Sequence, residues 1–206
     1  MLYETSAYPP EFTYKLLTAT ITPRPIAWIT TQSADGARNA APYSFFNMMG
    51  DNPPIVAVGM MRDPVKGFKD TCSNILATGE FVVNLVPVAL ADQMNATCVN
   101  APAGVDELDL AGLETLSSVR ISPPRIKGAP VNLECTLHSA VVTGPHQTLA
   151  IGRVEVIHIA DEMLLDAERG HVDNGKLDLI ARLHGSGLYQ KGGERFEMTR
   201  PVWGES

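Results

Sequence analysis

The sequence predicts an α+β fold that is mainly β: an antiparallel Greek-key barrel with a few peripheral helices, formed by residues 1–206 as a single domain. Apolar and β-branched runs that are typical of strands recur along most of the chain. The helical stretches between them do not alternate regularly with these runs, which disfavours a parallel doubly wound sheet. We find no internal repeat, low-complexity tract or linker that would divide the chain.

The clearest predicted hairpin joins two long β-rich runs, Val131–Thr143 and Leu149–Ile159, across the Gly144–Pro145 pair. A second hairpin turn is expected at Asp35–Gly36, because glycine adopts the positive φ that tight turns need. The other expected elements are, in chain order, a short helix or turn over Tyr14–Ala19, strands over Ile26–Gln32, Arg38–Met49 and Ile55–Met61, a helix over Lys66–Thr78 ending at Gly79, a strand over Phe81–Val86, a helix over Pro87–Val99, a loop with a helical turn over Asn100–Leu116, a weakly helical segment over Asp166–Ala181 and a Gly-rich segment over His184–Gly193.

Composition is ordinary for a globular protein and argues against two classes of partner. Sixteen Lys and Arg against 23 Asp and Glu give a net charge of −7, which disfavours binding to nucleic acid or to an anionic membrane. The N-terminus lacks the pattern of a secretory signal, and no apolar run approaches the roughly 18 residues of a membrane span. Cys72, Cys98 and Cys135 are odd in number and widely spaced, which favours a reducing compartment. We therefore expect a cytoplasmic protein.

The run Pro42–Met49 places small polar residues between aromatic ones. A solvated strand does not need the adjacent Phe45 and Phe46, and a fully buried strand does not need Ser44 and Asn47. An extended edge that lies against a flat, hydrogen-bonding aromatic ring could use both kinds of side chain.

Several motifs, taken in order, resemble the flavin reductase-like, FMN-binding split-barrel family, which includes flavin reductases and flavoredoxins. The matching segments are Thr22–Trp28, Asn39–Asn47, Asp51–Pro54, Lys69–Thr71 followed by Asn74–Ile75, and Thr78–Asn84. The resemblance covers about residues 10–195. It implies a six-stranded split barrel that binds FMN at the interface of a homodimer.

Lys69, Asp70 and Thr71 stand at the start of a predicted helix, where free backbone N–H groups favour anions. From the residues alone, this could equally be a solvated helix start with Lys69 pointing into water. The resemblance implies instead that the three residues contact the flavin phosphate. It also implies a cofactor contact at Asn39, which begins the matching run Asn39–Asn47.

Hydroxyl and amide side chains occur on two neighbouring predicted strands, at Thr30, Thr31, Ser44 and Asn47. Alternate residues of a strand face the same side, so such groups can converge on one ligand, although ordinary strand-edge residues would look the same. The resemblance implies that this edge binds the isoalloxazine and ribityl groups. Of the Phe45–Phe46 pair, one ring is expected in the core and one near the flavin.

Three more residues complete the expected site. Arg24, held in an extended segment between Pro23 and Pro25, is either a surface charge or a contact to a flavin or nicotinamide phosphate. The Gly-rich segment from His184 to Tyr189 is either a flexible loop or, by resemblance, the family's C-terminal segment that closes over the flavin edge. Tyr189 is then a cofactor contact. His184 is the one candidate for proton transfer to a reduced product, and no other catalytic acid or base is expected.

The sequence has no Gly-x-Gly-x-x-Gly fingerprint after a strand, no Gly-x-Ser-x-Gly nucleophile motif and no metal-ligand spacing among its histidines. The resemblance implies an oxidoreductase, an NAD(P)H-dependent flavin reductase in which NADH or NADPH passes a hydride to FMN. Reduced flavin could then feed a partner monooxygenase. Two alternatives stay open: a flavoredoxin-like electron carrier with bound FMN, and a non-enzymatic FMN-binding protein.

Overall fold

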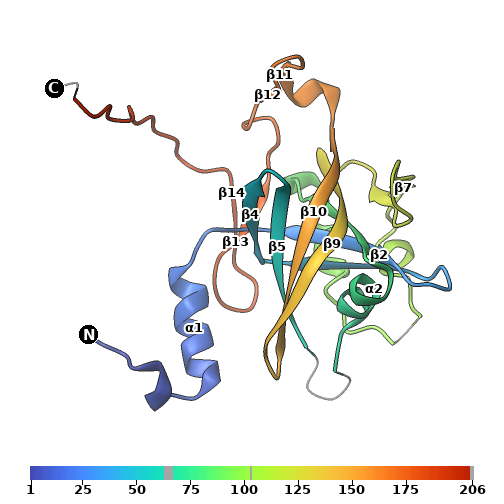
Figure 1. The fold of residues 1–206 in the computed structure, drawn as a ribbon, viewed down its shortest axis with the longest axis horizontal. Coiled ribbons are helices and arrows are strands. Elements are labelled where there is room, and N and C mark those ends of the chain that lie inside the picture. The colour runs from blue at the N-terminus through green and yellow to red at the C-terminus, as the bar shows by residue number, and fades with distance from the viewer. Residues whose placement is uncertain (63–66, 103, 205–206) are drawn as a thin grey trace.

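The computed structural model describes residues 1–62, 67–102 and 104–204. Within these residues, seven strands form one antiparallel sheet in the order β3-β2-β6-β9-β10-β5-β4 (Figure 1). The edge strands β3 (Arg38–Tyr43) and β4 (Phe45–Asp51) are consecutive in the chain and are separated only by Ser44. The sheet therefore curls until its two edges meet at this residue, which is how a barrel avoids free edges.

The other elements are short except for one hairpin. The remaining strands of the main sheet are β2 (Ala27–Gln32), β5 (Pro54–Met61), β6 (Glu80–Leu85), β9 (Val131–Gly144) and β10 (Gln147–Ile159). The smaller sheets contain β1 (Arg24–Pro25), β7 (Thr115–Leu116), β8 (Arg125–Ile126), β11 (Leu164–Asp166), β12 (His171–Val172), β13 (Ile180–Arg182) and β14 (Tyr189–Lys191). The helices are α1 (Pro10–Thr20), α2 (Asp70–Thr78), α3 (Ala91–Ala96) and α4 (Glu107–Leu110), with 3₁₀ turns η1 (Thr5–Ala7), η2 (Val88–Leu90) and η3 (Asp161–Met163).

Both predicted hairpins are confirmed. Strands β2 and β3 pair from Gln32 opposite Arg38, and Gly36 between them has a φ of 92°. Strands β9 and β10 pair directly from Gly144 opposite Gln147, across a two-residue connection. These are the places where local turn chemistry decides the fold.

The prediction of one continuous strand over Arg38–Met49 is wrong. The chain bends at Ser44, so that β3 pairs with β2 whereas β4 pairs with β5 on the other edge of the sheet. The barrel closes through this bend, because the chain must leave one edge strand and enter the other. The main sheet consequently has seven strands where the resemblance implied six.

The helix predictions succeeded in part. Helix α2 ends as expected, with Gly79 in the left-handed conformation at a φ of 74°, whereas the predicted start at Lys66 lies outside the described residues. Helix α1 is longer than Tyr14–Ala19, and Pro10 occupies its first turn, where a missing N–H costs nothing. The expected helix over Pro87–Val99 is divided into η2 and α3. The weak helix over Asp166–Ala181 is wrong: this polar segment forms turns and short strands.

Two buried clusters lie on opposite faces of the sheet, because neighbouring residues of a strand point to opposite sides. On β2, Ile29 belongs to one cluster with Phe81, and Trp28 belongs to the other with Met94. All four side chains are at most 1% exposed. A Cβ at Gly152 on β10 would overlap the ring of Phe81, which lies on β6. Glycine at position 152 therefore leaves the space that the Phe81 ring occupies.

The two ends of the chain extend away from the barrel (Figure 1). Helix α1 contains no buried residue, and residues 193–204 form no regular element beyond a turn. No helix within the described ranges is long and apolar enough to cross a membrane.

Candidate functional site

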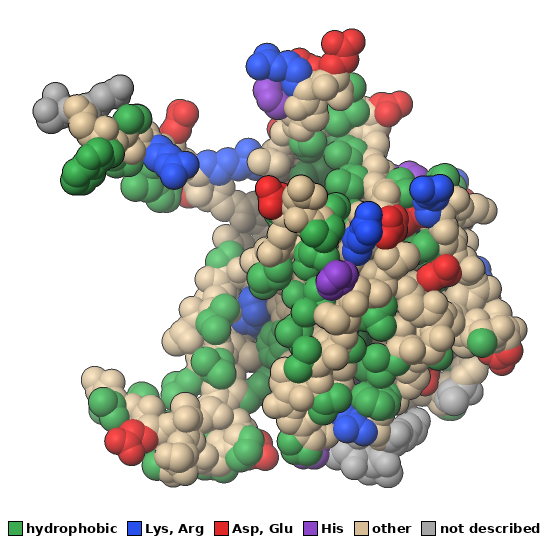
Figure 2. All heavy atoms as spheres, in the orientation of Figure 1, with side chains coloured by type: hydrophobic (Ala, Val, Ile, Leu, Met, Phe, Trp, Pro, Cys, Tyr) green, Lys and Arg blue, Asp and Glu red, His purple; other side chains and the backbone are tan. Residues whose placement is uncertain are grey.

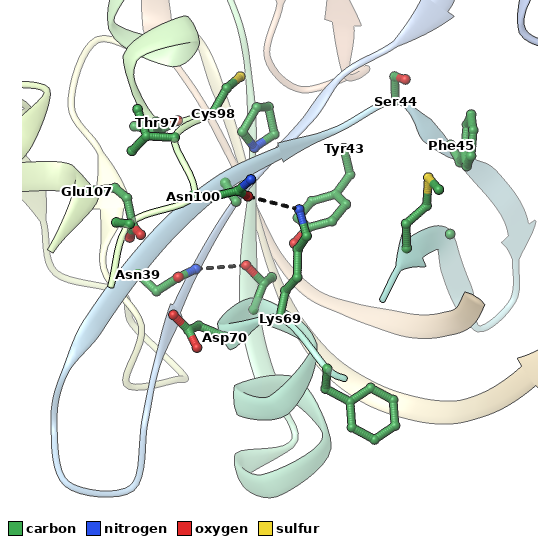
Figure 3. A pocket seen from close by; sticks show the side chains of 18 of the residues that line it. Asn39, Tyr43, Ser44, Phe45, Lys69, Asp70, Thr97, Cys98, Asn100 and Glu107 are labelled. Atoms are coloured by element: carbon green, nitrogen blue, oxygen red, sulfur yellow. Dashed lines mark hydrogen bonds between the residues drawn. The ribbon is translucent and has the colours of Figure 1, made fainter. Parts of the chain in front are cut away.

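A cavity of about 540 Å³ lies beside the bend between β3 and β4 (Figure 3). Its size suits a ligand larger than a few atoms. Three segments surround it: the bend itself, the start of α2 and the loop after α3. One residue of α1, two of β5 and one of α4 complete the lining. The lining residues are Tyr14, Asn39, Ala41, Pro42, Tyr43, Ser44, Phe45, Gly59, Met61, Phe68, Lys69, Asp70, Thr71, Thr97, Cys98, Val99, Asn100, Ala101 and Glu107.

One wall of the cavity is apolar and is shaped by the bend. Phe45 stands opposite Gly59 on β5, and a Cβ at Gly59 would lie 3.1 Å from the Cβ of Phe45 and 2.8 Å from Nε2 of Gln147. Glycine therefore lets the Phe45 side chain pack across β5. The Tyr14 ring of α1 meets Phe45 edge-on, with ring centroids 6.2 Å apart. Such a wall can cover an aromatic ligand and exclude water from it.

The opposite end of the cavity is polar and lies at the N-terminus of α2. No described side chain caps this nine-residue helix, so its first-turn N–H groups lack a side-chain acceptor. Lys69 Nζ donates to Asn100 Oδ1 at 3.5 Å, and Asn39 Nδ2 donates to Thr71 Oγ1 at 2.7 Å (Figure 3). A lysine ammonium beside uncapped helical N–H groups is an arrangement suited to a phosphate.

Three titratable side chains in the lining, Tyr43, Cys98 and Glu107, have pKa values that burial raises. Burial raises the pKa of Tyr43 to about 12, so its hydroxyl stays protonated and can donate. Burial also raises the pKa of Glu107, and the nearby carboxylates of Asp70 and Asp106 act in the same direction. Glu107 Oε2 accepts the backbone N–H of Ala40 at 3.1 Å, which fixes α4 against β3.

A hydrogen bond from a core residue positions the loop after α3. Trp28 Nε1 donates to Thr97 Oγ1 at 3.0 Å, and the same hydroxyl donates to the Met94 carbonyl at 2.7 Å. Trp28 is completely buried, so this bond joins the cavity lining to a rigid part of the sheet.

The structure brings half of the sequence-predicted cofactor residues together at this cavity. The six residues in its lining are Asn39, Ser44, Phe45, Lys69, Asp70 and Thr71. They come from β3, the bend, β4 and the start of α2, which are separate in sequence but adjacent in space (Figure 3).

The other predicted residues lie outside the lining. Thr30 Oγ1 donates to the Pro124 carbonyl at 2.5 Å, and Thr31 Oγ1 accepts from Asn74 Nδ2 at 3.0 Å. Both threonines are fully buried; the Thr30 hydroxyl ties the loop at Pro124 to the sheet, and the Thr31 hydroxyl ties α2 to it.

Phe46 packs against the core cluster that contains Phe81, which matches the prediction that one of the two phenylalanines is a core residue. Asn47 is exposed, and its side chain accepts the N–H of Met48 at 2.8 Å. Tyr189 packs against the cluster that contains Trp28.

Arg24 and His184 also lie away from the cavity lining. Arg24 is only 8% exposed, so it is not a surface charge, and its guanidinium group donates mainly to backbone carbonyls. His184 is exposed in the loop between β13 and β14.

Sequence reasoning missed several residues that line the cavity, chiefly Tyr14, Tyr43, Phe68, Glu107 and the loop 97–101. Tyr43 had a local signal, since it stands inside the aromatic run that ends at Met49. Glu107 follows Asp106, which caps α4 by accepting the N–H groups of Leu108 and Asp109. That pattern predicts a helix start but not which cavity the helix faces.

A curled antiparallel barrel with one apolar wall and one anion-binding end defines a small-molecule binding protein, and the comparisons with known proteins agree. Residues 19–175 match the family model described as the flavin reductase like domain. The chain is 39% identical to YwrF of Bacillus subtilis over 92% of this chain and 93% of that protein.

Two solved structures are close to this one along nearly their whole length. Nitrilotriacetate monooxygenase component B from Bacillus cereus is 36% identical with a TM-score of 0.90, over 96% of this chain and 98% of that one. The 2-nitrobenzoate 2-nitroreductase NbaA from Pseudomonas fluorescens is 29% identical with a TM-score of 0.89, over 100% of this chain and 99% of that one. The protein belongs to the flavin reductase-like family, and its curled sheet is a split barrel.

Proposed function

We propose that this protein is a flavin-dependent oxidoreductase that binds FMN in the cavity beside the bend and reduces flavin with NADH or NADPH. The observation that carries the proposal is the joining of two features in one cavity: an apolar wall made by Tyr14 and Phe45, and an anion-binding end made by Lys69 and the start of α2. The residues present therefore fit a ligand that is aromatic at one end and anionic at the other.

In this proposal each group of residues has a separate task. Lys69 and the first-turn N–H groups of α2 hold the phosphate, with Asp70 and Thr71 beside them. Asn39, Ser44 and the backbone of the bend orient the ring system and its side chain. Bound flavin supplies the hydride-accepting chemistry, and the protein has to bind, orient and shield it.

The proposal does not depend on an acid or base in the lining. His184 stays a prediction for proton transfer to a reduced product, and its exposed loop leaves it accessible to a second reactant. Thr30, Thr31, Phe46 and Tyr189 act on the cofactor through the residues that they contact. Asn47 is exposed on β4 and stays a predicted cofactor contact.

Stopped-flow mixing of the purified protein with NADH and NADPH tests this function. The protein should bind about one FMN per chain, which quenches the fluorescence of free FMN. Rapid bleaching with turnover of excess FMN is the expected result. Bleaching only by a reduced protein donor would mean an electron carrier, and no bleaching by any donor would mean a binding protein. A chain that neither turns yellow nor quenches FMN fluorescence would contradict flavin binding altogether.

We propose further that the protein works as a homodimer and can supply reduced flavin to a partner monooxygenase. Support comes from the two chain ends, which project from the barrel and carry exposed apolar side chains (Figure 2). Leu17 and Ile21 are 56% and 60% exposed, and Phe196 and Trp203 are 84% and 102% exposed. Apolar surface of this kind is typical of a protein interface. Light scattering should give about twice the mass of one chain, and a monomer that holds FMN would exclude the dimer.

A further inference from the structure

Arg24 makes an unusual set of contacts for an arginine next to, but outside, the cavity. Its Nη1 donates to the carbonyl oxygens of Thr18 and Ile21, each at 2.7 Å. Its Nη2 donates to the Leu183 carbonyl at 2.6 Å, and its Nε donates to Ser44 Oγ at 3.4 Å. One side chain therefore joins three segments: the end of α1, the bend between β3 and β4, and the loop after β13.

The contacts to α1 are those that a helix end requires. The last carbonyl groups of a helix have no partner within the helix, and the helix dipole favours a cation beside them. Arg24 supplies both the charge and two donors. Because a guanidinium group holds five N–H donors in a fixed fork, it can serve several carbonyls at once.

The position of α1 matters for the cavity because the helix contributes Tyr14 to the lining. Helix α1 has no buried residue, so packing holds it only loosely. Tyr14 meets Phe45 edge-on, and Cζ of Arg24 lies 5.9 Å from the centroid of the same Phe45 ring. Arg24 thus lies next to Phe45, one of the two residues of the wall, and also contacts Ser44 at the bend.

We propose that Arg24 is a positioning residue that seats α1 against the bend, so that Tyr14 and Phe45 form a closed wall of the flavin site. The inference rests on the proposed flavin binding. Arg24 acts through α1 and Ser44, and it does not contact the flavin phosphate itself: its donors face three backbone carbonyls and a hydroxyl, and the phosphate end of the cavity is formed by α2.

Two variants and two flavins test the proposal. Arg24→Ala and Arg24→Lys should both accelerate hydrogen exchange of the backbone amides in the second half of α1. Both should also weaken binding of FMN and of riboflavin by the same factor, on the order of tenfold, because an aromatic wall acts on the rings that the two flavins share. Arg24→Lys should not restore binding, since one ammonium group cannot reach all four acceptors.

Arg182→Ala is the matched control for charge. Arg182 stands opposite Arg24 on β13, and its guanidinium group donates to the carbonyls of Gly185 and Leu188 in the loop after β13, whereas its described hydrogen bonds include none to α1. This variant should leave exchange in α1 as in the wild type. Tyr14→Ala should weaken both flavins as Arg24→Ala does, and the double variant should lose little more than either alone.

The outcomes separate this inference from the proposed function. If Arg24→Ala weakens FMN alone and Arg24→Lys restores it, Arg24 contacts the phosphate and the inference is overturned. If exchange in α1 is the same in Arg24→Ala and wild type, Arg24 does not seat the helix and the inference is again overturned. If wild-type protein binds neither flavin, the proposed function fails, and the exchange comparison still decides whether Arg24 seats α1. Should Arg24→Ala fail to fold, Arg24→Lys and Tyr14→Ala carry the same comparison.

Discussion

Two glutamates of this protein are almost inaccessible to solvent, yet their surroundings shift their pKa values in opposite directions. Glu107 is 6% exposed at the edge of the cavity, and Glu134 on β9 is 0% exposed beneath the loop that follows β7. The pKa of Glu107 is raised, whereas that of Glu134 is lowered. Burial alone raises the pKa of a carboxyl group, so hydrogen-bond partners must account for the difference.

Glu134 has a complete set of donors. Its Oε1 accepts the N–H of Val119 at 2.8 Å and lies 2.6 Å from Nε2 of His158, and its Oε2 accepts the N–H of Arg120 at 2.8 Å. Burial acts to raise the pKa, but these three contacts favour the carboxylate and outweigh it. The charge is satisfied within the protein, and its task is to hold the loop.

Glu107 has fewer donors and less favourable neighbours. Burial raises its pKa, the backbone N–H groups of Ala40 and of Glu107 itself oppose that rise, and the carboxylates of Asp70 and Asp106 add to it. A carboxyl group at a cavity edge whose pKa is raised by burial and by neighbouring carboxylates is typical of a functional site. The comparison teaches that burial does not identify a functional carboxylate; its hydrogen-bond partners do.

The largest expected effect comes from removing Glu134, the buried carboxylate with a complete set of donors. Glu134→Ala should lower the free energy of unfolding by about 3 kcal/mol, because two backbone N–H groups lose a fully buried acceptor and His158 loses its partner. The folded-state pKa of Glu134 lies below the unfolded one, so the part of this stabilisation that depends on its charge exists above the ordinary carboxyl pKa and disappears as pH falls through the folded-state pKa. Urea unfolding at neutral and acid pH measures both the loss and its decline in acid.

Glu114→Ala is the control for removal of a glutamate. Glu114 forms an exposed ion pair with Lys127, so the free energy of unfolding should stay close to that of the wild type. Equal losses in Glu114→Ala and Glu134→Ala would show that the buried contacts of Glu134 add nothing.

The second prediction concerns the cavity side, where a change should affect binding and leave folding intact. Lys69→Ala should weaken FMN binding by roughly 1.5–3 kcal/mol, the range for a hydrogen bond to a charged group, or about ten- to a hundredfold in Kd. Lys69 is exposed, so the free energy of unfolding should change by less than about 0.5 kcal/mol.

Riboflavin is the matched ligand control for Lys69, because it has the same rings without the phosphate. Its affinity should be the same in Lys69→Ala and wild type. Raised salt should weaken FMN binding more in the wild type than in the variant, since screening acts on the charge that was removed. Equal losses for both flavins would mean that Lys69 supports the cavity and not the phosphate.

The sequence predicted the parts of the fold that depend on local chemistry. The turn at Gly36 and the helix end at Gly79 both need positive φ, and glycine there is a signal that a few residues carry. The bend at Ser44 has no such signal, because both halves of the run are extended. Which neighbour each half pairs with depends on how the whole sheet closes.

The same distinction applies to the candidate site. Lys69 and Asn39 were predictable because they stand in short motifs that resemble a known family. Glu107 was not, because the backbone N–H that it binds belongs to Ala40, 67 residues earlier in the chain. Thr30 and Thr31 were expected to face a ligand, but strand alternation gives the face of a side chain and not the loop or helix that covers it.

The smallest expected effect is that of Glu107→Gln, which tests directly whether the pKa of Glu107 is raised. Glutamine keeps an oxygen for the N–H of Ala40 but removes the charge that burial and the two aspartates oppose. The folded-state pKa of Glu107 lies above the unfolded one, so wild-type protein loses stability as pH rises through that folded-state pKa. The variant has no such loss, and should become more stable than wild type by up to about 1 kcal/mol at neutral pH, with no gain in acid.

Urea unfolding of Glu107→Gln and Glu134→Gln across the same pH series gives the sharpest form of the comparison. The stability of each variant relative to wild type should change with pH in opposite directions: the Glu107 variant gains as pH rises, and the Glu134 variant falls further behind. The two changes replace the same side chain by the same amide, so differences in size or shape cancel. If both variants follow wild type in parallel across the series, neither carboxyl group has a shifted pKa, and the contrast between the two glutamates has no physical basis.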